Sequence, residues 1–235
     1  MNLLNSFSSK SRKLATVTNE AEPASGGDWL FEEYREQVID LLYRVDDALA
    51  RRKKRIVQFI SPGVSEGTSS IAWGYARASA QMLKRRVLLL TSSSGASDHH
   101  PSHPSTVMIE DMASNRSIAD AIEPIGDKPF VATVSMEDAF SRETAGGTVD
   151  DGLWQRLYEH FDEIVIDSPS PSVSHLGRML ASYADGVIVV IEAEKTRDPV
   201  AKKLIADLHS VQANVIGTVL NKRRYYVPGA IYDKL

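Results

Sequence analysis

Short apolar runs recur along the chain and alternate with segments whose apolar residues have helical spacing. The runs are rich in valine, isoleucine and leucine and do not alternate with polar residues, which is typical of strands buried on both faces of a sheet. We expect strands at residues 56–60, 87–90, 130–134, 164–166, 187–191 and 215–220. Helices are expected between them, at residues 68–84, 117–123, 151–161, 174–183 and 198–210. This β-α-β order predicts a three-layer α/β/α domain around a mostly parallel sheet.

One amphipathic helix is expected ahead of the first strand, at residues 29–50. Its apolar positions follow a helical period, namely Leu30, Tyr34, Val38, Leu41, Leu42 and Val45. Residues 1–28 lack such a period and are rich in Ser, Thr, Asn, Glu and Gly, so we expect a disordered N-terminal tail there. The folded domain is therefore expected to span residues 29–235.

The composition excludes several kinds of chemistry. The chain of 235 residues contains no cysteine, which excludes disulfides, thiolate metal sites and cysteine nucleophiles. Its net charge of −4 gives no general attraction to nucleic acid, and no nucleic-acid partner is expected. No uncharged apolar stretch of about 18 residues occurs and the N-terminus lacks the pattern of a secretory signal, so a cytoplasmic protein is expected. His99, His100 and His103 lie in a serine-rich loop that presets no coordination geometry, and no metal site is expected.

The candidate site lies where the first expected strand ends, because ligands of open α/β sheets bind beyond the carboxyl ends of the strands. There the chain reads Ser61-Pro62-Gly63-Val64-Ser65-Glu66-Gly67-Thr68-Ser69-Ser70 and then enters a helix. A loop of small residues that opens a helix directs backbone N–H groups at phosphate. The strand at 164–166 is followed by Asp167, in the arrangement that places an acid near a loop-bound magnesium ion.

These motifs resemble those of the ParA/MinD-type ATPases with a deviant P-loop, and most closely those of the cytoplasmic kinase domain of the bacterial tyrosine autokinases. In that family the loop reads roughly S-P-x-P-G-E-G-K-S-T. Five residues match it, namely Ser61, Pro62, Glu66, Gly67 and Ser69, and Ser70 is a mild change. The resemblance covers roughly residues 29–235. It implies the remnant of a nucleotide site at Glu66, Gly67, Thr68, Ser69, Ser70, Asp167 and Asn221.

Three further segments match the same family in order and spacing. Residues 166–169, Ile-Asp-Ser-Pro, match the family's I-D-T-P, and residues 184–187 match its A-D-G-V. Thr196 and Arg197 match features that follow. Residues 219–221 match a V-L-N segment whose asparagine, here Asn221, lies near the adenine in relatives. The order of these motifs, more than the loop alone, carries the resemblance.

Charged residues that the family uses on ATP are missing from this chain. Thr68 stands where the family has the lysine that holds the β and γ phosphates, and a neutral threonine supplies no such charge. After the second strand, Thr91 and Ser93 replace both carboxylates of the family's V-L-L-I-D-A-D motif. With these losses the resemblance implies a pseudokinase-like protein that is not an active enzyme and needs no cofactor.

The resemblance also implies where the protein acts and what it binds. It implies a scaffold or regulator of a membrane polysaccharide co-polymerase, or chain-length regulator, in exopolysaccharide biosynthesis and export, held at the inner membrane by that partner. Glu32 and Arg35 match two positions of the E-x-x-R-x-x-R stretch with which relatives assemble into rings. Val38 does not match the third, so a homo-oligomer weaker than such a ring is expected. The family's tyrosine-rich tail is matched by Tyr225, Tyr226 and Tyr232, as phosphotyrosines or as an amphipathic anchor.

Two other functions stay open. One is an active ATP-binding tyrosine autokinase that uses ATP or ADP with magnesium and takes Lys84, Arg85 or Arg197 in place of the loop lysine. The other is a ParA-like positioning module, whose only support is the basic run at residues 51–55, and this run also suits a helix C-terminus. Asp167 equally suits a turn cap, and the loop equally suits a plain helix N-terminus.

Overall fold

The computed structural model describes residues 34–53, 55–91 and 151–223, together with the backbone of three further strands at residues 12–16, 106–108 and 131–135. In the helix that begins at residue 151, the side chains of residues 151–153 and 156 are outside this description. Within these ranges, no helix has the length and apolar character that crossing a membrane requires.

An eight-stranded sheet forms the centre of the molecule, and its paired strands are all parallel. The strands are β1 (Arg12–Thr16), β2 (Arg55–Ile60), β3 (Val87–Thr91), β4 (Thr106–Met108), β5 (Val131–Ser135), β6 (Glu163–Asp167), β7 (Gly186–Glu192) and β8 (Val215–Asn221). Their order across the sheet is β1-β8-β7-β2-β6-β3-β5-β4. All six predicted strands are confirmed, and β2 lies between β6 and β7.

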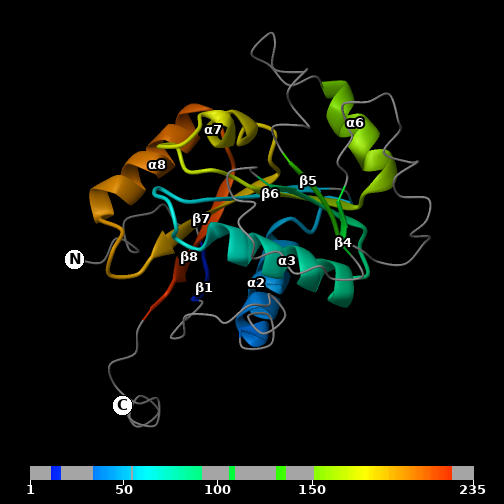
Figure 1. The fold of residues 1–235 in the computed structure, drawn as a ribbon, viewed down its shortest axis with the longest axis horizontal. Coiled ribbons are helices and arrows are strands. Elements are labelled where there is room, and N and C mark those ends of the chain that lie inside the picture. The colour runs from blue at the N-terminus through cyan, green and yellow to red at the C-terminus, as the bar shows by residue number, and fades with distance from the viewer. Residues whose placement is uncertain are drawn as a thin grey trace.

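Helices cover both faces of this sheet (Figure 1). They are α2 (Arg35–Ala48), α3 (Thr68–Met82), α6 (Asp151–His160), α7 (Leu176–Leu180) and α8 (Asp198–Ser210). α2 and α3 pack on one face, and α6, α7 and α8 pack on the other. The predicted three-layer α/β/α fold is therefore confirmed. The helix predicted at residues 117–123 lies outside the described residues.

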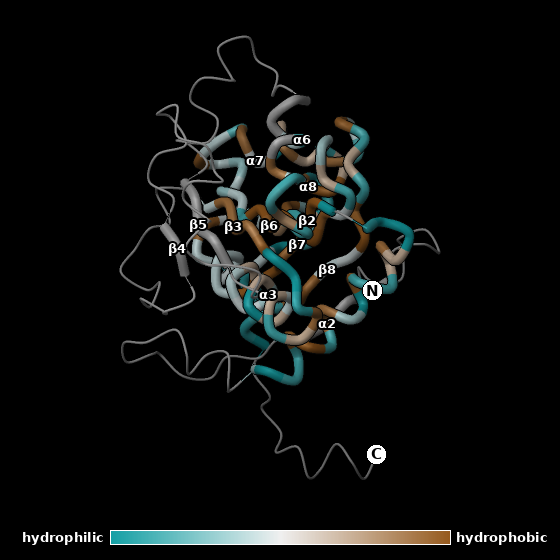
Figure 2. Tube along the Cα trace, turned by 90° about the vertical axis from the view of Figure 1, so that its right-hand side faces the viewer, coloured by the Kyte–Doolittle hydropathy of each residue, from teal (hydrophilic) through white to brown (hydrophobic). Residues whose placement is uncertain are grey.

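Side chains of the central strands point alternately into two hydrophobic cores. From β2, Ile56 and Ile60 join the core under α6, α7 and α8, whereas Val57 and Phe59 join the core under α2 and α3. The strands run as a hydrophobic band between the helices (Figure 2). Because both faces of these central strands are buried, side chains that point to either face are apolar. This explains why the apolar runs do not alternate with polar residues.

Strand β1 lies inside the segment that the sequence analysis predicts as a disordered tail. Its residues pair in parallel with β8 at the edge of the sheet, for example Arg12 with Gly217 and Thr16 with Leu220. The prediction of a tail is therefore wrong for residues 12–16. The five residues Arg-Lys-Leu-Ala-Thr contain too few apolar positions to show a strand pattern, because an edge strand pairs through its backbone.

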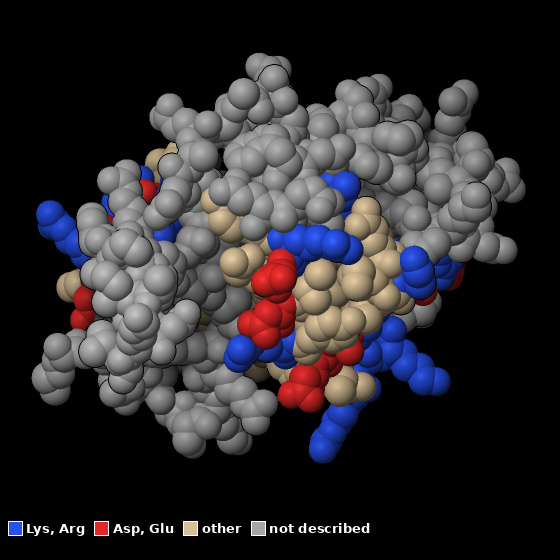
Figure 3. All heavy atoms as spheres, turned by 90° about the horizontal axis from the view of Figure 1, so that it is seen from below, with Lys and Arg blue, Asp and Glu red and all other residues tan. Residues whose placement is uncertain are grey.

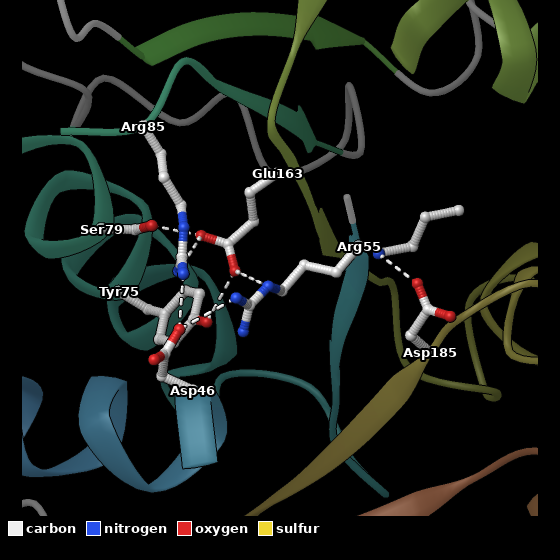
Figure 4. A network of polar contacts seen from close by, with 8 residues as sticks. Asp46, Arg55, Tyr75, Ser79, Arg85, Glu163 and Asp185 are labelled. Atoms are coloured by element: carbon white, nitrogen blue, oxygen red, sulfur yellow. Dashed lines mark hydrogen bonds and ion pairs between the residues drawn. The ribbon is translucent and has the colours of Figure 1, made fainter. Parts of the chain in front are cut away.

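A buried ionic network ties α2 to the end of the sheet at which the parallel strands begin (Figure 4). Asp46 of α2 accepts hydrogen bonds from Arg55 at 2.9 Å and from Arg85 at 2.5 Å. Both arginines also lie 3.7 Å from the carboxylate of Glu163, which is fully buried at the start of β6. Burial alone would raise the pKa of Asp46, but Arg85 and Arg55 hold this pKa below its usual value.

Two side chains of α3 complete this network around Glu163. The hydroxyl of Tyr75 donates to one carboxylate oxygen at 2.9 Å, and the hydroxyl of Ser79 donates to the other. Burial and the adjacent Glu163 raise the pKa of Tyr75 well above its usual value, so the phenol stays protonated and donates. We name these six residues the α2 clasp, which consists of Asp46, Arg55, Tyr75, Ser79, Arg85 and Glu163.

Candidate phosphate-binding site

The loop after β2 meets the ends of its neighbouring strands at one edge of the sheet. Because the strands are parallel and β2 lies between β6 and β7, Asp167 at the end of β6 and Glu192 at the end of β7 come to this edge. Asn221 ends β8, which pairs with β7, and reaches the same place. The structure thus brings together Glu66, Gly67 and Asn221, three residues of the expected nucleotide site, and Ser69 of that site hydrogen-bonds Asp167.

The backbone of the loop turns twice through the left-handed region. Ser65 has φ 60° and Gly67 has φ 87°, and Gly67 is the residue that precedes α3. Alternation of right- and left-handed residues points successive N–H groups toward one side, which makes a concave anion-binding nest. A Cβ atom on Gly67 would lie 2.1 Å from Nδ2 of Asn221, so this position requires glycine.

The carbonyl groups of the same loop are held from β8. Asn221 is buried, and its Nδ2 donates to the carbonyl oxygen of Glu66 at 2.8 Å. Lys222, the next residue, donates from Nζ to the carbonyl oxygen of Ser65 at 2.7 Å. With two carbonyl groups tied outward to β8, the loop keeps the conformation in which its N–H groups are free to face a ligand.

The side chain of Glu66 anchors the loop to β7. This carboxylate is buried, and its Oε2 accepts from the backbone N–H of Glu192 at 3.3 Å. The hydroxyl of Thr196 also hydrogen-bonds it. Burial raises the pKa of Glu66, although Thr196 and the N–H of Glu192 act in the opposite direction. Glu66 is therefore a fixed part of the loop's frame.

The first turn of α3 supplies hydroxyl groups and no cation. Thr68 is 7% exposed, and its Oγ1 has no hydrogen-bond partner among the described residues. Ser69 hydrogen-bonds Asp167, while Ser70 is exposed. Burial raises the pKa of Asp167 to about 6, although the hydrogen bond from Ser69 lowers it. The hydroxyl of Thr68 and the amides of this turn fit an anion.

Asp167 is the residue of this site that bears on magnesium binding. Magnesium is usually held by one or two carboxylates, substrate phosphates and water. Asp167 is the one carboxylate that ends β6, and it is already hydrogen-bonded by Ser69, whereas β3 ends in the uncharged Thr91. The described part of the chain contains no cluster of three His, Asp or Glu side chains that could hold a metal ion.

Of the three cations that the sequence offers as replacements for the loop lysine, two lie at the wrong edge of the sheet. Lys84 and Arg85 follow the end of α3, about 22 Å from its first residue for a helix of this length, and Arg85 is bound in the α2 clasp. Arg197 is exposed at the start of α8, beside Thr196.

The ParA-like alternative also loses support, because two arginines of the basic run are engaged within the protein. Arg55 is buried in the clasp, and Arg52 lies 3.4 Å from Asp185.

Two residues of this edge were missed by the sequence analysis. Lys222 could have been found, because it directly follows Asn221 and so emerges at the same end of the sheet. Gln58 could not, because it lies inside an apolar strand pattern. Its fully buried amide donates to the hydroxyl of Ser168 and to the carbonyl oxygen of Gly177, both at 2.6 Å. Gln58 therefore fixes the segment after Asp167 to α7.

Of the remaining predicted residues, only Arg35 lies within the part of the chain that the structure describes. Arg35 is exposed in the first turn of α2, where it was expected, and Glu32 lies outside the described residues. Tyr225, Tyr226 and Tyr232 also lie outside them.

The side of the molecule formed by α2 and α3 carries both acidic and basic side chains over the surface that the structure describes (Figure 3).

The fold is similar to that of bacterial tyrosine kinase domains. The chimerical protein CapA2B2 matches with a TM-score of 0.63 and 14% identity over 92% of this chain and 96% of that one. The kinase domain of the Escherichia coli tyrosine kinase ETK matches with a TM-score of 0.58 and 10% identity, over 93% and 94% of the two chains. The BceF tyrosine kinase domain matches with a TM-score of 0.58 and 15% identity, over 90% and 93%. No protein-family model and no curated protein matches the sequence.

Proposed function

We propose that this protein is a non-catalytic, pseudokinase-like scaffold or regulatory partner of a membrane polysaccharide co-polymerase in exopolysaccharide biosynthesis. The observation that carries this proposal is Thr68, which is buried and neutral at the first position of α3. The tyrosine autokinases have their phosphate-binding lysine at this position. The chain therefore keeps the fold of a tyrosine kinase domain over at least 90% of its length, but not the charge that handles ATP.

Loss of this charge removes most of what a kinase contributes to its reaction. Phosphoryl transfer depends almost wholly on positioning and on charges that stabilise the transferred group. At this edge of the sheet, the loop offers Thr68, β3 ends in Thr91, and Asp167 is buried beside Ser69. These residues support binding of an anion, but they give little electrostatic stabilisation of the transition state of phosphoryl transfer.

A scaffold also needs a surface with a fixed shape, and α2 supplies one. Its buried face packs on α3, where a Cβ atom on Gly74 would lie 3.4 Å from Val38, and its end is held by Asp46 in the α2 clasp. The opposite face carries Arg35 and the half-exposed ring of Tyr43. This exposed face of α2 is the proposed contact with the co-polymerase or with a second copy of the chain, and it brings the protein to the inner membrane.

Co-purification with the co-polymerase tests this function. The full chain is expressed with and without the co-polymerase of the host's exopolysaccharide system, and its share in the solubilised membrane fraction is measured. We expect retention only when the co-polymerase is present, and a lower share for Arg35→Glu. Lys203→Glu is the matched control, because Lys203 is exposed on α8, across the sheet. No retention of the wild-type chain contradicts the proposal, and equal retention of both variants contradicts the use of α2.

An active autokinase is the second candidate, and one contact favours it. Lys222 places an ammonium group 2.7 Å from the carbonyl oxygen of Ser65, so a cation does reach the loop, although from β8. An active enzyme must transfer phosphate to its own tyrosines, whereas a scaffold must not. Measurement of phosphotyrosine separates these two functions.

A further inference from the structure

Two turns at the end of the sheet where the parallel strands begin carry cations that the fold does not use. Arg51 and Lys53 lie between α2 and β2, and Lys84 lies between α3 and β3. All three residues are exposed, and their side chains form no ion pair or hydrogen bond within the described part of the chain. Hydrogen bonding to the last carbonyl groups of α2 therefore does not account for these cations.

The acidic side chains around these turns are already paired with other residues. Each has an arginine partner, namely Asp46 and Glu163 in the α2 clasp, Asp162 with Arg86, and Asp185 with Arg52. The one other acid in residues 46–53 and 82–86 is Asp47. Arg51, Lys53 and Lys84 therefore leave a positive charge on this end of the molecule.

The two turns lie at one level of the sheet. Arg55 and Val87 both pair with Glu163 at the start of β6, so β2 and β3 begin in register. Neighbouring strands lie about 4.8 Å apart and β6 alone separates β2 from β3, so the starts of these strands are about 10 Å apart. Cations that are spread in this way fit a surface of many anionic groups better than they fit a single small anion.

An apolar side chain lies among these cations. Met82, the last residue of α3, is 39% exposed, and Lys84 follows it by two residues. Lys84 has φ 56°, in the left-handed region where helices usually place glycine after their last turn. The chain thus carries a positive charge where the backbone alone favours another residue. An apolar side chain beside lysines suits the boundary of a bilayer, where anionic headgroups meet acyl chains.

We propose that these four residues, Arg51, Lys53, Met82 and Lys84, which we name the basic end, rest on an anionic lipid bilayer. The three cations contact headgroup phosphates, and Met82 reaches the boundary of the acyl chains. A bilayer is favoured over nucleic acid, because a phosphate backbone does not reward the apolar contact of Met82.

This inference goes beyond the proposed function, because the contact itself involves no co-polymerase. Three cations give a weak contact that salt screens, so the basic end does not retain the protein on a membrane by itself at physiological salt. It orients a chain that the co-polymerase already holds, with the start of the sheet toward the lipid.

The variants remove charge at the basic end and, in the matched control, across the sheet. Lys53→Gln with Lys84→Gln removes two cations from the basic end. Lys202→Gln with Lys203→Gln removes two from the exposed surface of α8, so both double variants change the net charge equally. Met82→Ser removes the apolar contact and leaves every charge in place.

The experiment is co-sedimentation of the full chain with vesicles at low ionic strength, where surface charges are least screened. Vesicles of phosphatidylglycerol and phosphatidylcholine are compared with vesicles of phosphatidylcholine alone. We expect binding to the anionic vesicles only. The affinity of Lys53→Gln/Lys84→Gln should be about 25-fold lower than that of the wild type, at about fivefold for each cation. The control double variant should stay within about twofold of the wild type, and Met82→Ser should bind more weakly.

Several outcomes would overturn the inference. A wild-type chain that does not bind anionic vesicles is one, and unchanged binding by Lys53→Gln/Lys84→Gln is another. An equal loss for Lys202→Gln/Lys203→Gln is a third, because the attraction would then follow net charge alone. Binding to duplex DNA as tight as to the vesicles, with no effect of Met82→Ser, would identify a surface for nucleic acid instead. The vesicles contain no co-polymerase and co-purification in detergent contains no bilayer, so the two proposals fail separately.

Discussion

Asp167 is a buried acid whose surroundings favour its neutral form. Its side chain is 4% exposed at the end of β6, and burial raises its pKa from 3.8 to about 6. In the unfolded chain this carboxyl loses its proton near pH 4. Between about pH 4 and pH 6 the folded protein therefore binds more protons than the unfolded one. Stability contributed by Asp167 falls as the pH rises through this window and stays low above it.

Replacement of Asp167 by asparagine should therefore stabilise the protein at neutral pH. A difference of about two pH units corresponds to about 3 kcal/mol in the free energy of unfolding. We expect Asp167→Asn to gain about 2–3 kcal/mol over the wild type near pH 7 and almost nothing near pH 4. Urea denaturation at both pH values measures this gain. A gain that is the same at the two pH values would show that the charge of Asp167 is not the cause.

Single residues differ in how far the sequence reveals them. Gly67 and Asn221 were both expected at the site because their motifs resemble those of the tyrosine autokinases, and the structure places the two residues side by side. The carbonyl contact of Lys222 depends on a left-handed backbone turn that no pattern of apolar residues encodes. Gln58 is hidden because a single amide inside an apolar strand does not interrupt the pattern.

At the scale of elements, α2 is held by charge as well as by apolar packing. Its apolar stripe was predictable from helical spacing, and Val38, Leu41, Leu42 and Val45 are buried as expected. The α2 clasp was not predictable, because its members come from two helices, two strands and the turn before β3. A fully buried glutamate between two arginines is stable only while all partners are present.

Removal of Glu163 should therefore destabilise the fold strongly. Glu163→Ala leaves Arg55 and Arg85 short of one carboxylate in a buried place, and we expect a loss of about 3–5 kcal/mol in the free energy of unfolding. The control is Asp40→Ala, which breaks the exposed pair of Asp40 with Arg44 and should cost at most about 0.5 kcal/mol. Chemical denaturation measures both. If the two variants lose equal stability, the clasp does not fix α2. If Glu163→Ala does not fold, Glu163→Gln replaces it in the comparison, because its side-chain amide keeps hydrogen-bonding oxygen and nitrogen atoms.

At the scale of the whole molecule, the central sheet followed from the sequence and its edges did not. The central strands leave apolar runs in the sequence, so β2, β3 and β5 to β8 were all found. β1 and β4 were missed; they form the two lateral edges of the sheet, and their sequences, RKLAT and TVM, contain no long apolar run. The resemblance also drew attention to Thr68 and Thr91, which stand where the tyrosine autokinases have charged residues.

Phosphate transfer by the full chain tests the central claim most directly. The purified protein is incubated with ATP and magnesium, and ADP release and tyrosine phosphorylation are measured, the latter by mass spectrometry. We predict no phosphate on Tyr225, Tyr226 or Tyr232, and ADP release that is the same for the wild type and Asp167→Ala. Magnesium-dependent phosphotyrosine that is abolished by Asp167→Ala would contradict the account, because it would show that the site still transfers phosphate without a lysine in its loop.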